Sequence, residues 1–317
     1  MVSFDVAHRK EEAGRASEPG SVLPPTSLII CSRNRPKLLF ESVASVLRGQ
    51  STPSEILIMD QSDAAHPTLS TLESVRGCDV RYVRTNAQGE SPAKNEAIGL
   101  ARYPILVFTD DDVLVTPTWF QTLVAALLNV GPRSLVMGQV PPLNAGNEKG
   151  FAPTMKLGDT PEVYVGRVGA DVLCPINMAM HRSVFEELGG FDERLGAGAP
   201  FPGAEDNDFG FRALEAGYRI VYEPRAVVYH RAWRRERDYL RVHWTYARGQ
   251  GAFYAKHLSL RDWYILRRFG WDITRRIKRF PQRVRWRDRQ KALGDIVYVT
   301  GLLSGTLQWL LTQTKAP

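Results

Sequence analysis

The sequence predicts an α/β protein with a mostly parallel, doubly wound sheet, followed by a basic helical C-terminal extension. Over roughly the first 230 residues, apolar runs of strand length alternate with segments of helical spacing, which is typical of strand–helix–strand units. From residue 231 onward this alternation ends, and arginine is interleaved with aromatic residues. The two parts of the chain therefore differ in both periodicity and charge.

The composition is that of an ordinary globular protein, because 44% of the 317 residues are hydrophobic and 24% are charged. The cysteines, Cys31, Cys78 and Cys174, are widely spaced and odd in number. They predict neither a disulfide framework nor a paired-cysteine metal site, and they favour a reducing compartment. Residues 1–26 are polar and lack the apolar segment of a signal peptide, so we expect a mobile lead-in.

The net charge is distributed unevenly along the chain. The whole chain carries +7, whereas residues 231–291 contain 19 Lys or Arg against 5 Asp or Glu and carry +14. The remainder is therefore acidic, with a net charge of −7. An acidic body that carries a strongly basic C-terminal section is an asymmetry that calls for an explanation.

Apolar runs at residues 27–31, 55–60 and 80–84, and a run that starts at Ile105, predict the strands in chain order. A helical pattern with Pro36 at its start follows the first run, and residues 93–101 predict a second helix. Ser32, Arg33 and Arg35 lie between the first strand and its helix, where a helix N-terminus favours an anion. The glycine patterns of dinucleotide-binding and P-loop sites are absent from this turn, which argues against both.

The strongest functional signal is the stretch 105–115, which reads ILVFTDDDVLV. Its apolar start predicts a buried strand, and it runs directly into Asp110, Asp111 and Asp112. Ligands of open α/β sheets bind at the carboxyl ends of the strands, so these carboxylates are expected at the functional edge. Because alternate side chains of an extended segment point to opposite sides, we expect Asp110 and Asp112 to converge on a divalent cation while Asp111 points elsewhere. The alternative is a solvated acidic loop.

Residues 119–128 predict an apolar-faced helix, and residues 135–140 predict a further strand. Residues 141–162 are rich in Pro, Gly and Asn and have no periodicity. They predict a loop or flap near the site.

A second informative region spans residues 174–230. Asn177 lies in a short run before a helical pattern at 183–188, and Glu205, Asp206 and Asp208 lead into another helix. The acidic residues have an alternative explanation, since carboxylates in the first turn of a helix stabilise it by about 0.3–1 kcal/mol each. His230 ends a strand-like run, as the other candidate ligands do, although a lone histidine is more often structural.

Taken together, these stretches resemble glycosyltransferase family 2 over about residues 26–232. The motifs that carry the resemblance are IICSRNRP, EILIMDQSD, NAQGESPAKNEAIGLARYPILVFTDDDV, NMAMHRSVFEELGGFDERLG, GAEDNDFGFRALEAGYRIVYEP and VVYH, in the order the family shows. Members are inverting, metal-dependent nucleotide-sugar transferases of the GT-A fold. The resemblance therefore implies a GT-A domain at residues 27–232 and an extension at 233–317.

Position by position, the resemblance implies a metal site formed by Asp110, Asp112 and His230, with Asp206 as the catalytic base. Lys94 stands where the family usually has arginine, which keeps the positive charge but loses the bidentate geometry. Asp60 would contact the nucleobase. The full nucleotide- and donor-binding set comprises Ser32, Arg33, Arg35, Asp60, Gly89, Lys94, Asp110, Asp111, Asn177 and Glu205.

This chemistry is physically consistent. An inverting transfer needs a base on the acceptor hydroxyl, opposite the departing nucleotide diphosphate, and Asp206 would serve. A divalent cation would neutralise the leaving group as a Lewis acid. Mn²⁺ or Mg²⁺ fits carboxylate and diphosphate oxygens, and one imidazole slightly favours Mn²⁺. We identify no second carboxylate for a covalent glycosyl intermediate, so retention is the weaker interpretation.

The basic section after residue 231 has three interpretations: a solvated or packed helical tail, a nucleic-acid surface, or an element at a membrane surface. Residues 294–311 are apolar apart from Asp295, Gln308 and small hydroxyl side chains, and their length is borderline for a membrane span of about 20 residues. A packed helix, a hairpin or an interfacial helix is the better expectation. We favour a peripheral location on the cytoplasmic face of the cell membrane, a lipid-linked or surface-glycan acceptor, and no nucleic-acid partner.

Two other functions remain open on the sequence. A nucleotide-sugar-binding scaffold at the membrane, without catalytic activity, would share the fold. A metal-dependent phosphohydrolase also uses clustered aspartates, but it usually needs more metal ligands than the sequence supplies.

Overall fold

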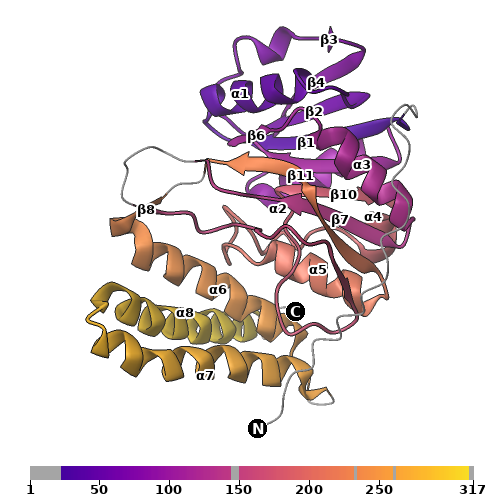
Figure 1. Ribbon diagram of the computed structural model, residues 1–317. Coiled ribbons are helices and arrows are strands. Elements are labelled where there is room, and N and C mark those ends of the chain that lie inside the picture. Colours follow the sequence, from indigo (N-terminus) through magenta and orange to yellow (C-terminus); the bar gives the residue numbers. More distant parts are fainter. Residues whose placement is uncertain (1–22, 144–149, 232–233, 260–261, 314–317) are drawn as a thin grey trace.

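The structure is a computed structural model, and it describes residues 23–143, 150–231, 234–259 and 262–313. Of the predicted lead-in at residues 1–26, positions 1–22 lie outside the described residues, and the first strand begins at Thr26. Figure 1 shows a body built around a sheet, with a layer of three long helices below it.

The strands and helices follow the order expected from the sequence, with additional short strands. The strands are β1 (Thr26–Ser32), β2 (Glu55–Asp60), β3 (Ser74–Val75), β4 (Cys78–Arg84), β5 (Ile105–Asp110), β6 (Val113–Val115), β7 (Ser134–Gln139), β8 (Gly150–Phe151), β9 (Glu162–Val165), β10 (Asn177–His181), β11 (Arg219–His230) and β12 (Arg234–Arg235). The helices are α1 (Pro36–Leu47), α2 (Glu90–Leu100), α3 (Trp119–Val130), α4 (Arg182–Leu188), α5 (Glu205–Glu215), α6 (Tyr239–His257), α7 (Trp263–Arg285) and α8 (Arg289–Gln313).

Ten strands form one sheet within the described residues, in the order β3-β4-β2-β1-β5-β10-β7-β11-β6, with β9 beside β11. The strands β4, β2, β1 and β5 are mutually parallel, and β7 is parallel to β11. The predicted largely parallel α/β sheet is thereby confirmed. The strand β10 runs antiparallel between β5 and β7, because it enters the sheet at the edge where β5 ends, with Asn177 opposite Thr109.

The register of the parallel strands brings their polar ends to one edge. Ser32 at the end of β1 lies opposite Asp60 of β2, and Cys31 lies opposite Asp110 of β5. Of the strands that lead to this edge, β2 is fully buried, and β1 and β5 are nearly so. Burying each large aliphatic side chain stabilises the fold by about 1.5–3 kcal/mol, so the core holds the polar edge in place.

Two segments differ from the expectations. The stretch 105–115 is not one strand: it turns at Asp111 and Asp112, and β6 then pairs antiparallel with β11. The turn occurs where the apolar run ends and the carboxylates of Asp111 and Asp112 contact Ser32 and Arg35. Within the predicted loop 141–162, residues 144–149 lie outside the described residues, while β8 pairs with β12 and β9 begins at Glu162.

The C-terminal extension consists of α6, α7 and α8, and α8 packs along α6 (Figure 1). Glycine allows this close approach, since a Cβ at Gly251 would lie 2.1 Å from the Leu302 carbonyl oxygen, and one at Gly305 2.1 Å from that of Arg248. The segment 294–311 is therefore part of one packed helix. None of the helices within the described ranges combines the length and apolarity that a membrane span requires.

Asp295, which interrupts the apolar C-terminal segment, is buried between α7 and α8. Its carboxylate lies 3.4 Å from Arg276 Nη1 and 2.7 Å from Arg283 Nη1, both on α7. A buried carboxylate needs such partners, because an unpaired one would carry a large desolvation cost. The pairing fixes α7 against α8.

Candidate active site

The predicted metal ligands come together at the turn after β5. One ligand atom from each of Asp110, Asp112 and His230 lies within 4.8 Å of the others, and His230 Nε2 is 3.2 Å from Asp112 Oδ1. The long strand β11 delivers the imidazole, since His230 pairs with Val113 just beyond the aspartates. The backbone N–H of Arg231 then donates to the Asp112 carbonyl at 2.9 Å. Residues more than a hundred positions apart thus form one cluster.

The electrostatics of the cluster suit a divalent cation. Burial, together with the nearby Glu90 carboxylate, raises the pKa of Asp110 to about 7. Burial alone would raise the pKa of Asp112, but the hydrogen bond and charge of His230, with Arg35, lower it. Two carboxylates and an imidazole are donors that Mn²⁺ accepts, and a bound cation would stabilise the ionised form of Asp110. The residues present therefore fit the expected metal.

Asp111 makes its polar contacts outside the metal cluster. Its carboxylate accepts a hydrogen bond from Ser32 Oγ at 2.7 Å and another from Arg35 Nη1 at 2.9 Å. The same Arg35 nitrogen lies 3.2 Å from Asp112 Oδ2, so one guanidinium bridges two neighbouring aspartates. Arg35 directly precedes α1, and it also lines the cavity at the ends of β1 and β5.

A first cavity of about 280 Å³ lies at the ends of β1 and β5. Gly89 lines it at the start of α2 with φ of +111°, where a Cβ would lie 3.2 Å from the Ala197 carbonyl oxygen. Arg33 and Arg35 supply positive charge and Asp110 the metal side. The predicted residues that line this cavity are Ser32, Arg33, Arg35, Gly89, Asp110 and Asp111.

Asp60 lies at the predicted edge but outside the lining of the described cavities. Its oxygens accept hydrogen bonds from the Ser62 backbone at 2.9 Å and from the hydroxyl groups of Ser62 and Tyr82. These contacts order the loop after β2. Gln61, the first residue of this loop, lines the first cavity and accepts a hydrogen bond from the Gly89 N–H at 3.1 Å. A nucleobase contact by Asp60 stays a prediction.

Asn177 is buried inside the sheet, and its expected place close to the donor sugar stays a prediction. Its side chain is 0% exposed and accepts from Trp119 Nε1 at 2.8 Å. Its amide donates to the carbonyl groups of Gln139 and Ala226 at 3.0 and 2.8 Å. With both amide N–H donors used inside the sheet, Asn177 joins β10 to β7 and β11. The residues just before it, Cys174 to Ile176, line the second cavity described below instead.

Lys94 lies beneath the site, almost fully buried, with its ammonium paired to Glu90. Burial alone would lower the pKa of Lys94, but the charges of Glu90, Asp110 and Glu205 raise it. The lysine therefore stays charged and offsets carboxylates below the cavities. Glu205 is also buried, and burial together with the Glu90 and Asp206 carboxylates raises its pKa well above the usual range.

A second cavity, of about 580 Å³, joins the metal cluster to the predicted base. Asp110, Asp112 and His230 line it, and so does Asp206 at the start of α5. Burial raises the pKa of Asp206 to about 6, although its carboxylate accepts the Asn207 N–H at 2.8 Å. A carboxylate with a pKa near neutrality is suited to accept a proton.

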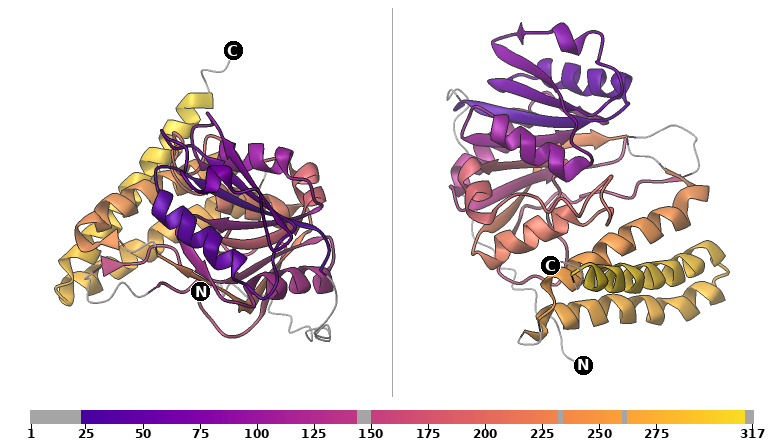
Figure 2. Two further views of the ribbon diagram at one scale, coloured as in Figure 1. Left: turned by 90° about the horizontal axis from the view of Figure 1, so that it is seen from above. Right: turned by 180° about the vertical axis from the view of Figure 1, so that it is seen from behind.

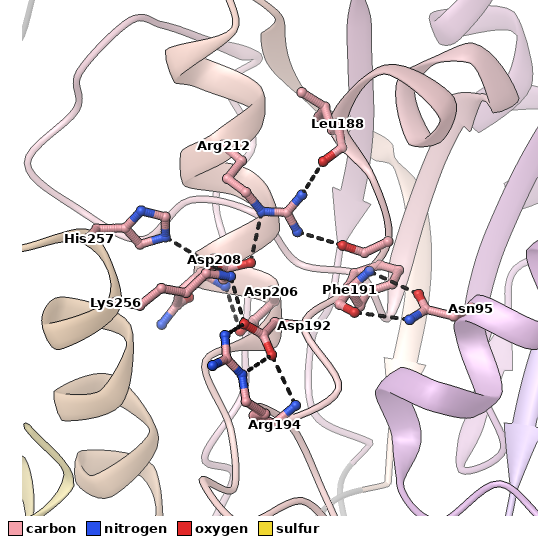
Figure 3. Close-up of polar contacts among 12 residues, drawn as sticks. Asn95, Leu188, Phe191, Asp192, Arg194, Asp206, Asp208, Arg212, Lys256 and His257 are labelled. Carbon is pink, nitrogen blue, oxygen red and sulfur yellow. Dashed lines mark hydrogen bonds and ion pairs between the residues drawn. The ribbon is translucent and has the colours of Figure 1, made fainter. Parts of the chain in front are cut away.

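Figure 3 shows how the start of α5 is held by α6. Asp208, fully buried, lies 2.6 Å from Lys256 Nζ and 2.8 Å from His257 Nε2, and accepts from Arg212 Nε at 2.9 Å. Asp208 is therefore structural through its pairs with α6 and Arg212, while Asp206 lines the second cavity.

Sequence reasoning missed several residues that line the second cavity. Glu90 lines both cavities. It directly follows Gly89, a predicted site residue, and this neighbouring position is a sequence signal that could have identified it. Gln250 of α6 gave none: its Oε1 accepts from Asn207 Nδ2 at 2.7 Å, and its Nε2 donates to Asp171 at 3.1 Å. The others include Arg234, Tyr246 and Tyr298.

The chain is similar to known glycosyltransferases in sequence and in fold. The sequence profile of Glycosyl transferase family 2 matches residues 27–189, just over half of the chain. The pre-mycofactocin glycosyltransferase of Mycobacterium tuberculosis is 25% identical over 248 residues, covering 76% of this chain and 48% of that protein. The validoxylamine A glucosyltransferase of Streptomyces hygroscopicus subsp. limoneus is 26% identical over 231 residues, covering 62% and 50%. The chain thus spans about half the length of these relatives.

Among solved structures, a mannosyltransferase from Pyrobaculum calidifontis in complex with GDP-Man and Mn²⁺ superposes with a TM-score of 0.61. The match covers 94% of this chain and 91% of that one at 17% sequence identity, so it establishes a shared GT-A fold. With the profile match over the sheet and the clustered strand ends, the chain belongs to glycosyltransferase family 2.

Proposed function

We propose that the chain transfers a sugar from a nucleotide-diphosphate sugar to an acceptor hydroxyl with inversion, using Asp206 as the base and a divalent cation, Mn²⁺ or Mg²⁺. One observation carries the proposal: Asp206 and the Asp110–Asp112–His230 cluster line the same cavity. The GDP-Man and Mn²⁺ bound by the Pyrobaculum calidifontis enzyme support the choice of donor and ion.

The geometry supports the following roles. Asp110, Asp112 and His230 would hold the cation, which neutralises the diphosphate leaving group as a Lewis acid. Arg33 and Arg35 at the first cavity place positive charge for the nucleotide phosphates. Asp206, across the second cavity, takes the proton of the acceptor hydroxyl. A single base on the acceptor side gives direct displacement, and hence inversion.

The test begins with the donor. Thermal-shift measurements with UDP-, GDP- and dTDP-sugars plus Mn²⁺ identify the nucleotide by the largest stabilisation. With that donor, Asp206→Asn is expected to lower the transfer rate by about 10²- to 10⁴-fold while nucleotide affinity stays near wild type. Asp112→Asn is expected to weaken Mn²⁺-dependent nucleotide binding.

Asp63→Asn is a matched control, since Asp63 is an exposed aspartate that lines neither of the described cavities. A fully active Asp206→Asn variant would show that the base is misassigned. Donor hydrolysis with Mn²⁺ separates an enzyme from a scaffold without activity, because a scaffold binds the donor and leaves it intact. The anomeric configuration of the product, read by NMR, tests inversion.

A further inference from the structure

The helix α8 exposes an apolar stripe. Its members are between 42% and 59% exposed and recur at spacings of three, four or seven residues, which places them on one side of a helix. At 1.5 Å per residue the stripe is about 27 Å long. The opposite side of α8 packs against α6. The stripe comprises Leu293, Ile296, Leu303, Leu307, Leu310 and Leu311.

The helix α7 also presents exposed apolar side chains, here flanked by cations. Trp263, Leu266, Trp271, Ile277 and Val284 are exposed along it. Next to Ile277 and Val284 along the chain lie exposed basic residues with no carboxylate at ion-pair distance among the described residues: Lys278, Arg279 and Arg285 on α7, followed by Arg287 and Arg289. Apolar and unpaired cationic side chains therefore share one surface.

An apolar groove of about 290 Å³ joins the two helices. Ile277 and Phe280 of α7 line it together with Ile296 and Val299 of α8. Because Ile277 and Ile296 are also exposed, the surfaces of both helices meet at the groove. We call this combined surface, the α8 stripe with the exposed apolar and basic residues of α7, the α7–α8 face. Figures 1 and 2 show α7 as the helix of this layer farthest from the sheet.

Charge distinguishes the occupants of this face. Residues 263–313 contain 11 Lys or Arg and 3 Asp or Glu, a net charge of +8. A second copy of the chain would bring the same positive face, so self-association is opposed. A nucleic acid would account for the cations, but not for a stripe of leucine and isoleucine side chains that cannot stack on bases. An anionic lipid surface accounts for both features.

We propose that the α7–α8 face docks the chain on an anionic lipid bilayer. The α8 stripe lies at the boundary between headgroups and acyl chains, and the unpaired cations of α7 contact headgroup phosphates. The buried pairs of Asp295 with Arg276 and Arg283 hold the two helices together as one docking element. Negative surface charge is characteristic of the cytoplasmic leaflet, which supports a peripheral location there.

The docked orientation has a consequence for the acceptor, and this consequence rests on the proposed transferase function. Tyr298 of α8 lines the second cavity, whereas the next two residues, Val299 and Thr300, line the groove. Residues of α8 therefore line both the second cavity, which holds the proposed reaction site, and the lipid-facing groove. An acceptor sugar anchored by a lipid in the bilayer would lie within reach of Asp206.

The test is co-sedimentation of the full chain with vesicles of phosphatidylcholine alone or with about 30% phosphatidylglycerol. The wild type is expected to bind only the anionic vesicles. Lys278→Gln with Arg285→Gln is expected to weaken partitioning by about 25-fold, roughly fivefold for each cation removed. Leu303→Gln with Leu307→Gln is expected to weaken it at least tenfold. Both pairs are exposed, so the fold is retained, and circular dichroism checks this.

Matched controls lie outside the face. Lys37→Gln with Arg48→Gln removes two exposed cations, and Leu100→Gln with Leu128→Gln removes two exposed leucines. Both controls should bind like the wild type. Equal loss in test and control variants, or a wild type that ignores anionic vesicles, overturns the proposal. So does binding of single-stranded RNA in place of vesicles, or dimerisation that the leucine variant abolishes. Because the readout is binding, it is independent of transferase activity.

Discussion

The buried carboxylate of Asp208 provides a quantitative test of how α6 supports the site. It is 0% exposed and contacts Arg212, Lys256 and His257 at 2.6 to 2.9 Å (Figure 3). Asp208→Asn keeps the size of the side chain and removes its charge. The cations around it then lose a shared partner in a site that water barely reaches.

The expected cost follows from what each partner retains. Arg212 keeps hydrogen bonds to the carbonyl groups of Leu188 and Gly190, both at 2.7 Å, and Lys256 keeps Asp192 at 2.8 Å. Breaking a buried pair costs about 3–5 kcal/mol, and these remaining contacts favour the lower end, about 3 kcal/mol. At about 2 °C per kcal/mol for a chain of this size, the melting temperature should fall by about 6 °C.

Thermal unfolding followed by circular dichroism at pH 7 measures this change. Burial alone would raise the pKa of Asp208, but His257, Arg212 and Lys256 lower it. Its contribution to stability is therefore present above the unfolded-state pKa of about 3.9 and is lost as the pH falls through the lower folded-state pKa. The gap between variant and wild type should close at acidic pH.

The control is Asp79→Asn, which removes an exposed carboxylate paired with exposed Arg102 at 2.9 Å and should cost about 0–1 kcal/mol. Adding Lys256→Met to Asp208→Asn should recover part of the loss, because it removes an under-paired cation. An Asp208→Asn variant that melts within about 1 °C of the wild type would refute the assignment of Asp208 as the buried link between α5 and α6.

Two further predictions concern the reaction. Burial raises the pKa of Asp206 to about 6, and only its carboxylate form accepts a proton. With saturating Mn²⁺, which keeps Asp110 ionised, kcat/KM should therefore be flat above about pH 6 and fall about tenfold per pH unit below it. A profile that stays unchanged down to about pH 4.5, about one and a half units below that pKa, would contradict this. Gln250 accepts a hydrogen bond from Asn207 Nδ2 at 2.7 Å and so holds the residue next to the base. Gln250→Ala should therefore lower kcat about five- to tenfold and leave Mn²⁺-dependent nucleotide affinity unchanged. Equal losses in kcat and in affinity would indicate general damage to the fold.

Much of the body was predictable because local pattern and burial agree there. The runs at 27–31 and 55–60 are apolar throughout, and they became buried parallel strands whose ends share one edge. Asp110, Asp112 and His230 each follow such a run, so strand direction alone placed them at that edge. The roles of these residues in binding and catalysis stay predictions that the experiments above test.

Other features depended on contacts between segments distant in sequence. Asn177 is predicted to lie close to the donor sugar, and in the structure its side-chain amide is hydrogen-bonded inside the sheet to the Trp119 indole and two carbonyl groups. Gln250 carries no motif, and it lines the second cavity because α6 packs beside α5. No local pattern reports such partners, since they depend on packing.

The amino-acid order determined which segments become buried strands and which of them end in carboxylates, because hydrophobic periodicity is written locally along the chain. Only the tertiary structure decided that His230 lies 3.2 Å from Asp112, that Asp206 lines the same cavity, and that α8 leaves an apolar stripe exposed. These outcomes depend on how whole helices and strands pack, and packing is settled by the combined surfaces of elements that are far apart in the sequence.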